Sequence, residues 1–356
     1  MSAFKLVSPK RLPQAPKNQR RRNSSRLAIL PTTEAMLQAF ANFLELDVAN
    51  GDAAADTVYT YQRRVNQYID WCSEQGINPA LATDEDLKFY RRYLAQEKRQ
   101  KSATIALTLS VIRRFYAAAL AKGLVKENPA VGVKPPREKV DAAERITYLD
   151  EEELKQFLAA IPHDGRLKSL RDRSLLAIMA LQGPRTVELH RANFGDLVRS
   201  GSNWGLRVEG KGSIRTIPLR PDLSKVLWQY LEAREYAGEV LTKDSPLFIA
   251  VGNRFGGHRL SRRGIRWIVD EYLIAAKLKA RPTKEQQKIA EETTSSRRLS
   301  AHSLRHTAGT LGLRKGADLR QVQDLLGHKD PKTTALYAHV NDRHANNPAL
   351  GIDVDV

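Results

Sequence analysis

AHSLRHT at residues 301–307 is followed by GAD at 316–318, LLGH at 325–328 and TTALY at 333–337. Within this stretch, the guanidinium of Arg305 supplies a permanent planar fork of donors that matches the oxygens of a phosphate. The imidazoles of His302 and His328 can donate or move protons, and the phenol of Tyr337 can attack phosphorus. The stretch therefore predicts phosphoryl transfer through a tyrosyl intermediate.

In this order, the four motifs closely resemble the C-terminal signature of the tyrosine recombinases, the phage-integrase and Xer-like site-specific recombinases. The similarity extends from about residue 33 to about residue 340. The resemblance implies a mainly α-helical protein with a small β-sheet, in which an all-helical core-binding domain and a mixed α+β catalytic domain form a C-shaped clamp on DNA. It also implies cleavage and rejoining of DNA strands through a 3′-phosphotyrosine, for the integration, excision or resolution of DNA elements.

A further motif of the family falls at residues 183–189, which read GPRTVEL where the family usually shows Gly-Leu-Arg-x-x-Glu-Leu. The resemblance makes Arg185 the first catalytic arginine. Glu188 is expected to orient Arg185 or to support the catalytic residues from behind. Pro184 departs from the pattern, because proline removes a backbone donor and fixes φ next to the arginine. Lys211, between two glycines, resembles the lysine of the family's mobile β-hairpin.

The resemblance assigns a role to each residue of this predicted site, and it implies no cofactor. Two bidentate arginines stabilise the negative charge that develops on the non-bridging oxygens. A lysine gives a proton to the leaving alkoxide, one histidine handles the proton of the attacking phenol, and another hydrogen-bonds a non-bridging oxygen. In the order along the chain, the predicted catalytic residues are Arg185, Lys211, His302, Arg305, His328 and Tyr337.

His306 lies four residues after His302, so the two imidazoles share one face of a predicted helix. This spacing is compatible with zinc, but the sequence lacks the glutamate of the His-Glu-x-x-His metal motif. The arginine–phosphate interpretation is therefore favoured, and no metal is predicted. His306 is assigned to packing or to support of the catalytic residues.

The composition indicates a polyanionic partner. Lysine and arginine outnumber the acids 58 to 40, which gives a formal net charge of +18. Nucleic acid is the leading partner on this charge, although a basic protein that touches RNA incidentally and a membrane-surface binder remain open on charge alone. Cys72 is the only cysteine, so an internal disulfide is excluded and a reducing compartment fits. Without a signal peptide or an apolar run long enough to span a bilayer, the sequence predicts a DNA-associated bacterial protein of the cytoplasm.

Composition and periodicity divide the chain into five predicted segments. The catalytic segment is expected to contain a buried apolar stretch at 174–180, a hairpin over 204–219 and helices over 223–235, 261–277 and 303–315. The five segments are a basic flexible arm at 1–31, a helical SAM-like core-binding domain at 32–127, a linker at 128–146, the catalytic domain at 147–343 and a C-terminal tail at 344–356.

The helical domain and the arm carry many cations that are expected on exposed faces and in contact with phosphates. Ordinary solvated charges are the alternative for about half of them. These residues are Arg20, Arg21, Arg22, Arg63, Arg64, Arg91, Arg92, Lys101, Arg113 and Arg114.

The implied partners are double-stranded DNA with inverted half-sites and further copies of this chain, as a homo-tetramer in the synapse and a monomer in solution. Two other functions are weighed against recombination. A type IB topoisomerase-like enzyme would share the catalytic set but relax supercoils, and a non-catalytic DNA-binding protein would keep only the fold.

Overall fold

The computed structural model describes residues 31–48, 55–137, 146–210, 213–252, 256–281 and 299–338. The chain divides into two compact units, Met1–Lys139 and Val140–Val356. Almost all of the predicted arm, the middle of the predicted linker and the whole predicted tail lie outside the described residues.

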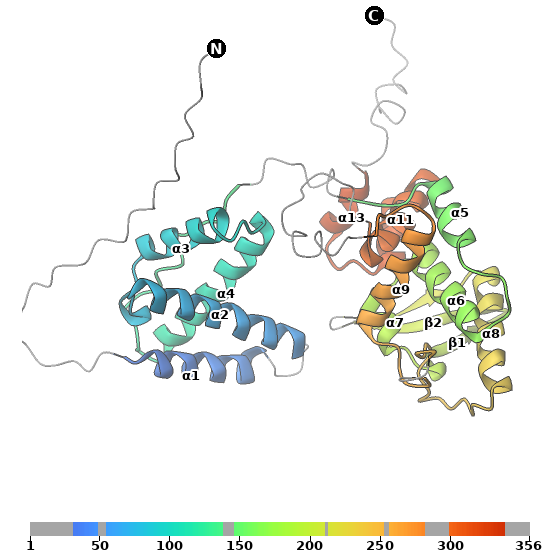
Figure 1. The fold of residues 1–356 in the computed structure, drawn as a ribbon, viewed down its shortest axis with the longest axis horizontal. Coiled ribbons are helices and arrows are strands. Elements are labelled where there is room, and N and C mark those ends of the chain that lie inside the picture. Colours follow the sequence, from blue (N-terminus) through green and yellow to red (C-terminus); the bar gives the residue numbers. More distant parts are fainter. Residues whose placement is uncertain are drawn as a thin grey trace, which may run out of the picture. The chain divides into compact units, whose positions relative to one another are not determined.

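The first unit is all-helical, as predicted (Figure 1). Thr32 caps the first helix by accepting a hydrogen bond from the backbone N–H of Ala35, and Thr83 and Asp86 form a capping box at the start of the third. The elements are α1 (Thr33–Phe43), a π-helical turn (Leu44–Val48), α2 (Ala55–Gln75), a 3-10 turn (Pro79–Leu81), α3 (Asp84–Gln96) and α4 (Ser102–Ala121).

Helix α4 forms the centre of this unit, with α1, α2 and α3 packed against it. Phe115 meets Phe40 of α1 edge-to-face at 5.7 Å between ring centroids, and the hydroxyls of Tyr116 and Tyr68 are 2.7 Å apart. Buried rings of this size supply most of the apolar surface that stabilises so small a domain. By length and composition α4 could also cross a membrane, but its apolar residues are the core of this unit.

The second unit combines helices with one three-stranded antiparallel sheet (Figure 1). The mixture of helices with a small sheet confirms the predicted fold class. The helices are α5 (Glu151–Ala159), α6 (Leu167–Gln182), α7 (Thr186–Arg191), α8 (Pro221–Tyr236), α9 (Arg262–Ala275), α11 (Ala301–Arg314), α12 (Leu319–Leu326) and α13 (Pro331–Ala338); the strands are β1 (Leu197–Ser200), β2 (Asn203–Gly210) and β3 (Ser213–Pro218).

Strand β2 lies in the middle of the sheet, where Leu206 pairs with Leu197 of β1 and with Ile217 of β3. Strands β2 and β3 form the predicted hairpin. Gly210 pairs with Ser213, so the tip that carries Lys211 lies outside the described residues. The sequence did not predict β1, because four residues are too few to establish an alternation.

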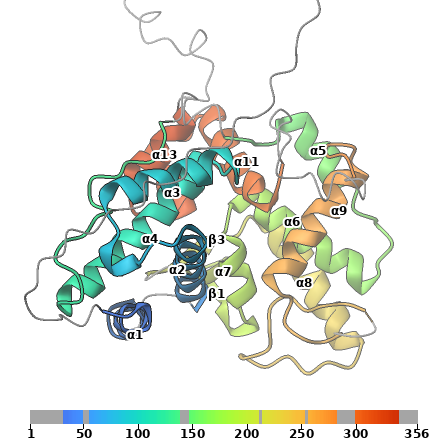
Figure 2. The same ribbon diagram turned by 60° about the vertical axis from the view of Figure 1, so that its left-hand side comes forward.

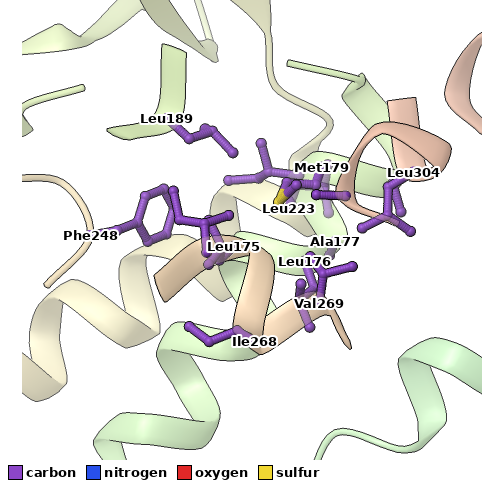
Figure 3. Close-up of a cluster of buried hydrophobic side chains, with 14 of the residues drawn as sticks. Leu175, Leu176, Ala177, Met179, Leu189, Leu223, Phe248, Ile268, Val269 and Leu304 are labelled. Carbon is purple, nitrogen blue, oxygen red and sulfur yellow. The ribbon is translucent and has the colours of Figure 1, made fainter. Parts of the chain in front are cut away.

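Helix α6 is buried almost all round, which confirms the prediction for residues 174–180. Figure 3 shows Leu175, Leu176 and Met179 of this helix among apolar side chains from neighbouring elements, including Phe248 and Leu304. The second half of α6 is apolar on almost every face, and such a segment can be stable only when other elements cover it. Helices α8 and α11 do so here.

Helices α11, α12 and α13 lie side by side at the carboxyl end of this unit, and α11 and α13 are adjacent in both views (Figures 1 and 2). A small apolar cluster of Ala308, Val322, Leu326 and Tyr337 joins them. Helix α12 begins at a capping box between Asp318 and Gln321. The sequence motifs at 316–337 therefore fold as two short helices against α11.

Candidate active site

Arg305 is the buried centre of the site, with 2% of its surface exposed. Its Nη1 donates to the carbonyl oxygen of Gly183 and its Nη2 to that of Leu326, each at 2.6 Å. These carbonyls lie at the C-terminal ends of α6 and α12, where a cation is favoured by the helix dipole. A guanidinium carries five donors, so these two bonds fix the side chain and leave capacity for a phosphate.

Gly183 fits this position for two reasons. Its φ of +63° lies in the left-handed region, which favours glycine. A Cβ added there would also lie 2.6 Å from Cδ2 of Leu326, so α12 could not approach as closely. Pro184 precedes the helical residues of α7 and therefore removes no hydrogen bond of that helix. Despite the departure from the family pattern at Pro184, Arg185 lies at the N-cap of α7.

Glu188 is fully buried and binds two arginines. Its Oε1 accepts from Nη1 of Arg185 at 2.9 Å and from Nη1 of Arg215 at 2.6 Å, and its Oε2 accepts from Nη2 of Arg215 at 3.2 Å. Burial alone would raise the pKa of this carboxyl, but the hydrogen bonds and charges of the two arginines hold the pKa below its usual value. Glu188 therefore carries a negative charge that fixes both guanidiniums.

The turn after α12 links Arg185 and Arg305 to His328. Nη2 of Arg185 donates to the carbonyl oxygen of Gly327 at 3.1 Å, next to the Leu326 carbonyl that Arg305 binds. Gly327 has a φ of +63°, and a Cβ there would lie 2.6 Å from Nε of Arg215. His328 follows directly, and its Nδ1 is 2.9 Å from Oγ1 of Thr334 on α13.

Tyr337 of α13 lies between two histidines. Its ring stacks on His328 with 6.1 Å between centroids and an interplanar angle of 4°, and its hydroxyl is 2.8 Å from Nδ1 of His306. The ring of His302 in turn meets His306 edge-to-face at 4.4 Å between centroids. Tyr337 is buried, with 2% of its surface exposed.

Burial, and then the positive charges of the site, lower the pKa of its histidines. Burial and then the charge of Arg305 lower the pKa of His328 to about 4, and burial followed by the neighbouring His302 lowers the pKa of His306 to about 3. Burial raises the pKa of the Tyr337 phenol, while the charges of Arg305 and Arg185 act to lower it. The buried hydroxyl therefore lies within electrostatic range of both guanidiniums.

The structure brings most of the predicted site together. Through the contacts above, Arg185, Arg305, His302, His328 and Tyr337 form one connected group, and Glu188 and His306 lie within it. Lys211 is outside the described residues.

Arg215 belongs to the same group, and the sequence interpretation missed it. The signal was present in the strand alternation of β3, because Arg215 shares its face with Ile217 and Leu219, which are buried. An arginine on the inward face of a strand indicates a buried acidic partner.

The predicted phosphate contacts of the first unit differ in exposure. Arg63, Arg92, Lys101 and Arg114 are exposed, and their contact with DNA stays a prediction. Arg64 has only 8% of its surface exposed, and burial together with the charge of Arg63 lowers the pKa of its guanidinium. The expected exposed face is wrong for Arg64, because α2 turns this residue toward the core.

Two further arginines of the first unit hold the segment that leaves it. Nε of Arg113 donates to the carbonyl oxygen of Ala130 at 3.1 Å, and Nη1 of Arg91 donates to that of Lys134 at 3.0 Å. Their contact with DNA also stays a prediction. Arg20, Arg21 and Arg22 lie outside the described residues.

Comparisons with known proteins find relatives that match most of this chain. A tyrosine recombinase XerC of Pelobacter propionicus is 30% identical over 307 residues, which cover 86% of this chain and 90% of the relative. A crystal structure of the XerH site-specific recombinase bound to difH substrate superposes with a TM-score of 0.60 at 20% identity, over 90% of this chain and 84% of that one. A crystal structure of a lambda integrase tetramer bound to a Holliday junction superposes with a TM-score of 0.58 at 17% identity, over 85% of this chain and 76% of that one.

The two solved structures establish a shared fold. The family models go further, because they match both parts of the chain. The model of the phage integrase N-terminal SAM-like domain matches residues 37–123, and the model of the phage integrase family matches residues 147–344, more than half of the sequence. This protein belongs to the phage integrase family.

Proposed function

We propose that this protein is a site-specific DNA recombinase that cleaves and rejoins DNA strands through a 3′-phosphotyrosine formed on Tyr337. The observation that carries the proposal is the connected group around Arg305. A phenol lies within electrostatic range of two guanidiniums, which are fixed by a buried carboxylate and by backbone carbonyls. Such a preorganised cationic site favours the charge that develops on a phosphodiester during attack.

In this mechanism Arg185 and Arg305 bind the non-bridging oxygens of the scissile phosphate, and His328 adds a hydrogen bond. Oη of Tyr337 attacks phosphorus, and the 5′-oxygen leaves with a proton from Lys211. The phosphoester energy is kept in the covalent link, so a second 5′-hydroxyl can reverse the reaction. Strands are exchanged without ATP, and water does not act as the nucleophile.

Trapping on nicked suicide DNA tests this proposal. Cleavage of such a substrate releases a short fragment, so the covalent protein–DNA adduct accumulates and migrates slowly in a denaturing gel. Peptide mass mapping of the adduct is expected to find the nucleotide on Tyr337. A chain that binds its DNA without forming an adduct would be the non-catalytic alternative.

Lys211→Ala is expected to cleave ordinary DNA poorly, by about 100-fold or more, because the leaving alkoxide then lacks its proton donor. On a substrate with a 5′-bridging sulfur the same variant should recover, since a thiolate leaves without a proton. Lys155→Ala, an exposed lysine of the same unit paired with Glu152, serves as the control and should cleave both substrates like the wild type. Equal impairment of Lys211→Ala on both substrates would reject the assigned role.

For the assembly, we propose inverted half-sites in double-stranded DNA, a homo-tetramer on two such sites and a monomer without DNA. The lambda integrase tetramer on a Holliday junction supports the tetramer by likeness of fold. We also propose that the two units close on DNA as a clamp, and that the protein acts on DNA in a bacterial cytoplasm, as its relation to the Pelobacter protein suggests.

Recombination is favoured over topoisomerase-like relaxation, because the relatives and neighbours described above are recombinases and an integrase. Strand exchange between two copies of one DNA site separates these activities. Relaxation of supercoils without any demand on sequence would favour the topoisomerase alternative instead.

A further inference from the structure

We propose that Arg215 is a positioning residue that neutralises Glu188, so that the positive charge of Arg185 stays available to the scissile phosphate. This inference rests on the proposed function and concerns the same site. It assigns a role in DNA cleavage to an arginine that lies outside the sequence motifs and acts through two other residues.

The carboxylate of Glu188 is shared by two guanidiniums. Arg185 reaches it with Nη1 at 2.9 Å and with its backbone N–H at 2.6 Å. Arg215 binds it with both terminal nitrogens, Nη1 at 2.6 Å from Oε1 and Nη2 at 3.2 Å from Oε2. This two-point contact is the geometry in which an arginine binds a carboxylate most strongly. Arg215 is thus a full partner of Glu188.

The exposure of the three side chains indicates which of them a phosphate can reach. The exposed fraction is 36% for Arg185, 17% for Arg215 and 0% for Glu188. Arg185 is therefore the most accessible of the three groups, while the terminal nitrogens of Arg215 are directed at the buried carboxylate. Arg215 acts from behind Glu188 and need not touch DNA.

The charges of these groups explain why a second arginine is needed. Arg185 and Glu188 alone would form a neutral pair, in which the carboxylate cancels the charge of the guanidinium. With Arg215 added, two positive charges face one negative charge, so the group keeps a net positive charge. A phosphodiester gains negative charge during attack, and a preorganised site of net positive charge stabilises it.

The electrostatic effect of Arg215 extends beyond this group. Burial acts to raise the pKa of the Glu188 carboxyl, and the hydrogen bonds and charge of Arg215 oppose burial more strongly than those of Arg185 do. After burial, Arg305 and Arg185, the charge of Arg215 also lowers the pKa of His328. The charge of Arg215 is therefore felt at the residue that is expected to hydrogen-bond a non-bridging oxygen.

Stability alone does not account for an arginine at this position. The Nε of Arg215 is buried and makes no hydrogen bond within the described part of the chain. A buried donor without a partner destabilises a fold, and a buried ion pair is weak evidence of stabilisation. This Nε lies close to Gly327, where an added Cβ would be 2.6 Å away. The position is explained by the charge that Arg215 brings to the site.

The test compares Arg215→Gln with a double variant, Arg215→Gln combined with Glu188→Gln, on suicide DNA. Arg215→Gln leaves Glu188 to cancel the charge of Arg185, so adduct formation should slow by about 10- to 100-fold. In the double variant the charge of Glu188 is removed as well, and Arg185 keeps its own. The double variant should therefore cleave about tenfold faster than Arg215→Gln, because the two substitutions act on one interaction.

A second substrate tests whether the deficit concerns the charge of the phosphate. In a methylphosphonate, a methyl group replaces one non-bridging oxygen, so the attacked group is neutral. On this DNA the deficit of Arg215→Gln relative to the wild type should shrink to a few-fold, since less charge develops during attack. Arg215→Lys keeps the positive charge and should cleave ordinary DNA within a few-fold of the wild type.

Controls separate this role from folding. Arg207→Ala is the matched variant, because Arg207 lies in the same sheet and binds Asp196 through Nε at 3.2 Å and Nη2 at 3.0 Å. It should cleave both substrates like the wild type. Urea unfolding and gel shift check that each variant is folded and binds DNA under the assay conditions. If Arg215→Gln fails to fold, Arg215→Met takes its place in both comparisons.

Four outcomes would overturn the inference. In the first two, Arg215→Gln cleaves within a few-fold of the wild type, or the double variant is no faster than Arg215→Gln. In the others, the deficit is equal on the phosphodiester and the methylphosphonate, or Arg215→Lys is as slow as Arg215→Gln. A wild-type chain that forms no adduct would overturn the proposed function as well, whereas a wild-type adduct with any of these four outcomes would overturn this inference alone.

Discussion

Tyr337→Phe is expected to abolish the covalent DNA adduct while DNA binding stays unchanged. The substitution removes only Oη, and no other hydroxyl in the group around Arg305 is held between two histidines. The ring and its stacking on His328 are kept, so the architecture of α13 should persist. The measurement is adduct formation on suicide DNA, with binding followed by gel shift.

The same variant should lose a small amount of stability. Oη shares a buried hydrogen bond with His306, and such a bond contributes about 1 kcal/mol. Tyr148→Phe is the matched control, because the Tyr148 hydroxyl accepts from Arg314 at 2.8 Å in the same unit, away from the arginine pair. Tyr148→Phe should form the adduct. An adduct that persists in Tyr337→Phe would place the nucleophile elsewhere.

Glu188→Ala is expected to lower the free energy of unfolding and to impair DNA cleavage. Its carboxylate is fully buried, and it is the acidic partner that Arg185 and Arg215 share. Loss of one partner leaves uncompensated buried charge, which costs about 3–5 kcal/mol in measured cases. The released Arg185 would also lose its fixed geometry toward a phosphate. Urea unfolding and adduct formation measure the two effects.

The pH dependence of the stability of Glu188→Gln tests whether the charge of Glu188 is the source of this effect. Because the pKa of Glu188 is lowered in the folded chain, its charge contributes stability above the ordinary carboxyl pKa of about 4.3 that is lost as pH falls toward the folded value. The glutamine variant should lack this component of acid sensitivity. Glu152→Ala, an exposed glutamate paired with Lys155, should unfold like the wild type. Glu188→Ala with wild-type stability would show that the buried carboxylate is not needed to hold the arginines.

The sequence predicted the helical first domain, the helices over 223–235, 261–277 and 303–315 and the β2–β3 hairpin, because apolar periodicity is a local signal. It did not resolve α12 and α13, since eight residues give too few repeats of a helical period. The prediction that Arg64 is exposed was wrong for a related reason. An arginine beside Val65 sits at the edge of the apolar face, and only packing decides which way it turns.

The members of the candidate site could be named from motifs, but their mutual contacts could not. Nothing in a motif says that Arg305 binds the carbonyls of Gly183 and Leu326, because these residues are distant along the chain. Arg215 lies outside the motifs and joins the site only through pairing of the strands. The order of His302, His306 and Tyr337 likewise follows from how α13 packs on α11.

Both arginines of the site are held in part by main-chain oxygens at the end of α12, and this has a consequence for protein engineering. A carbonyl is supplied by any amino acid, so the outward side chains of α12, such as the exposed pair Arg320 and Asp324, do not enter the anchorage. That surface can be redesigned, for instance to attach a fluorophore or a targeting module, with the catalytic scaffold left untouched.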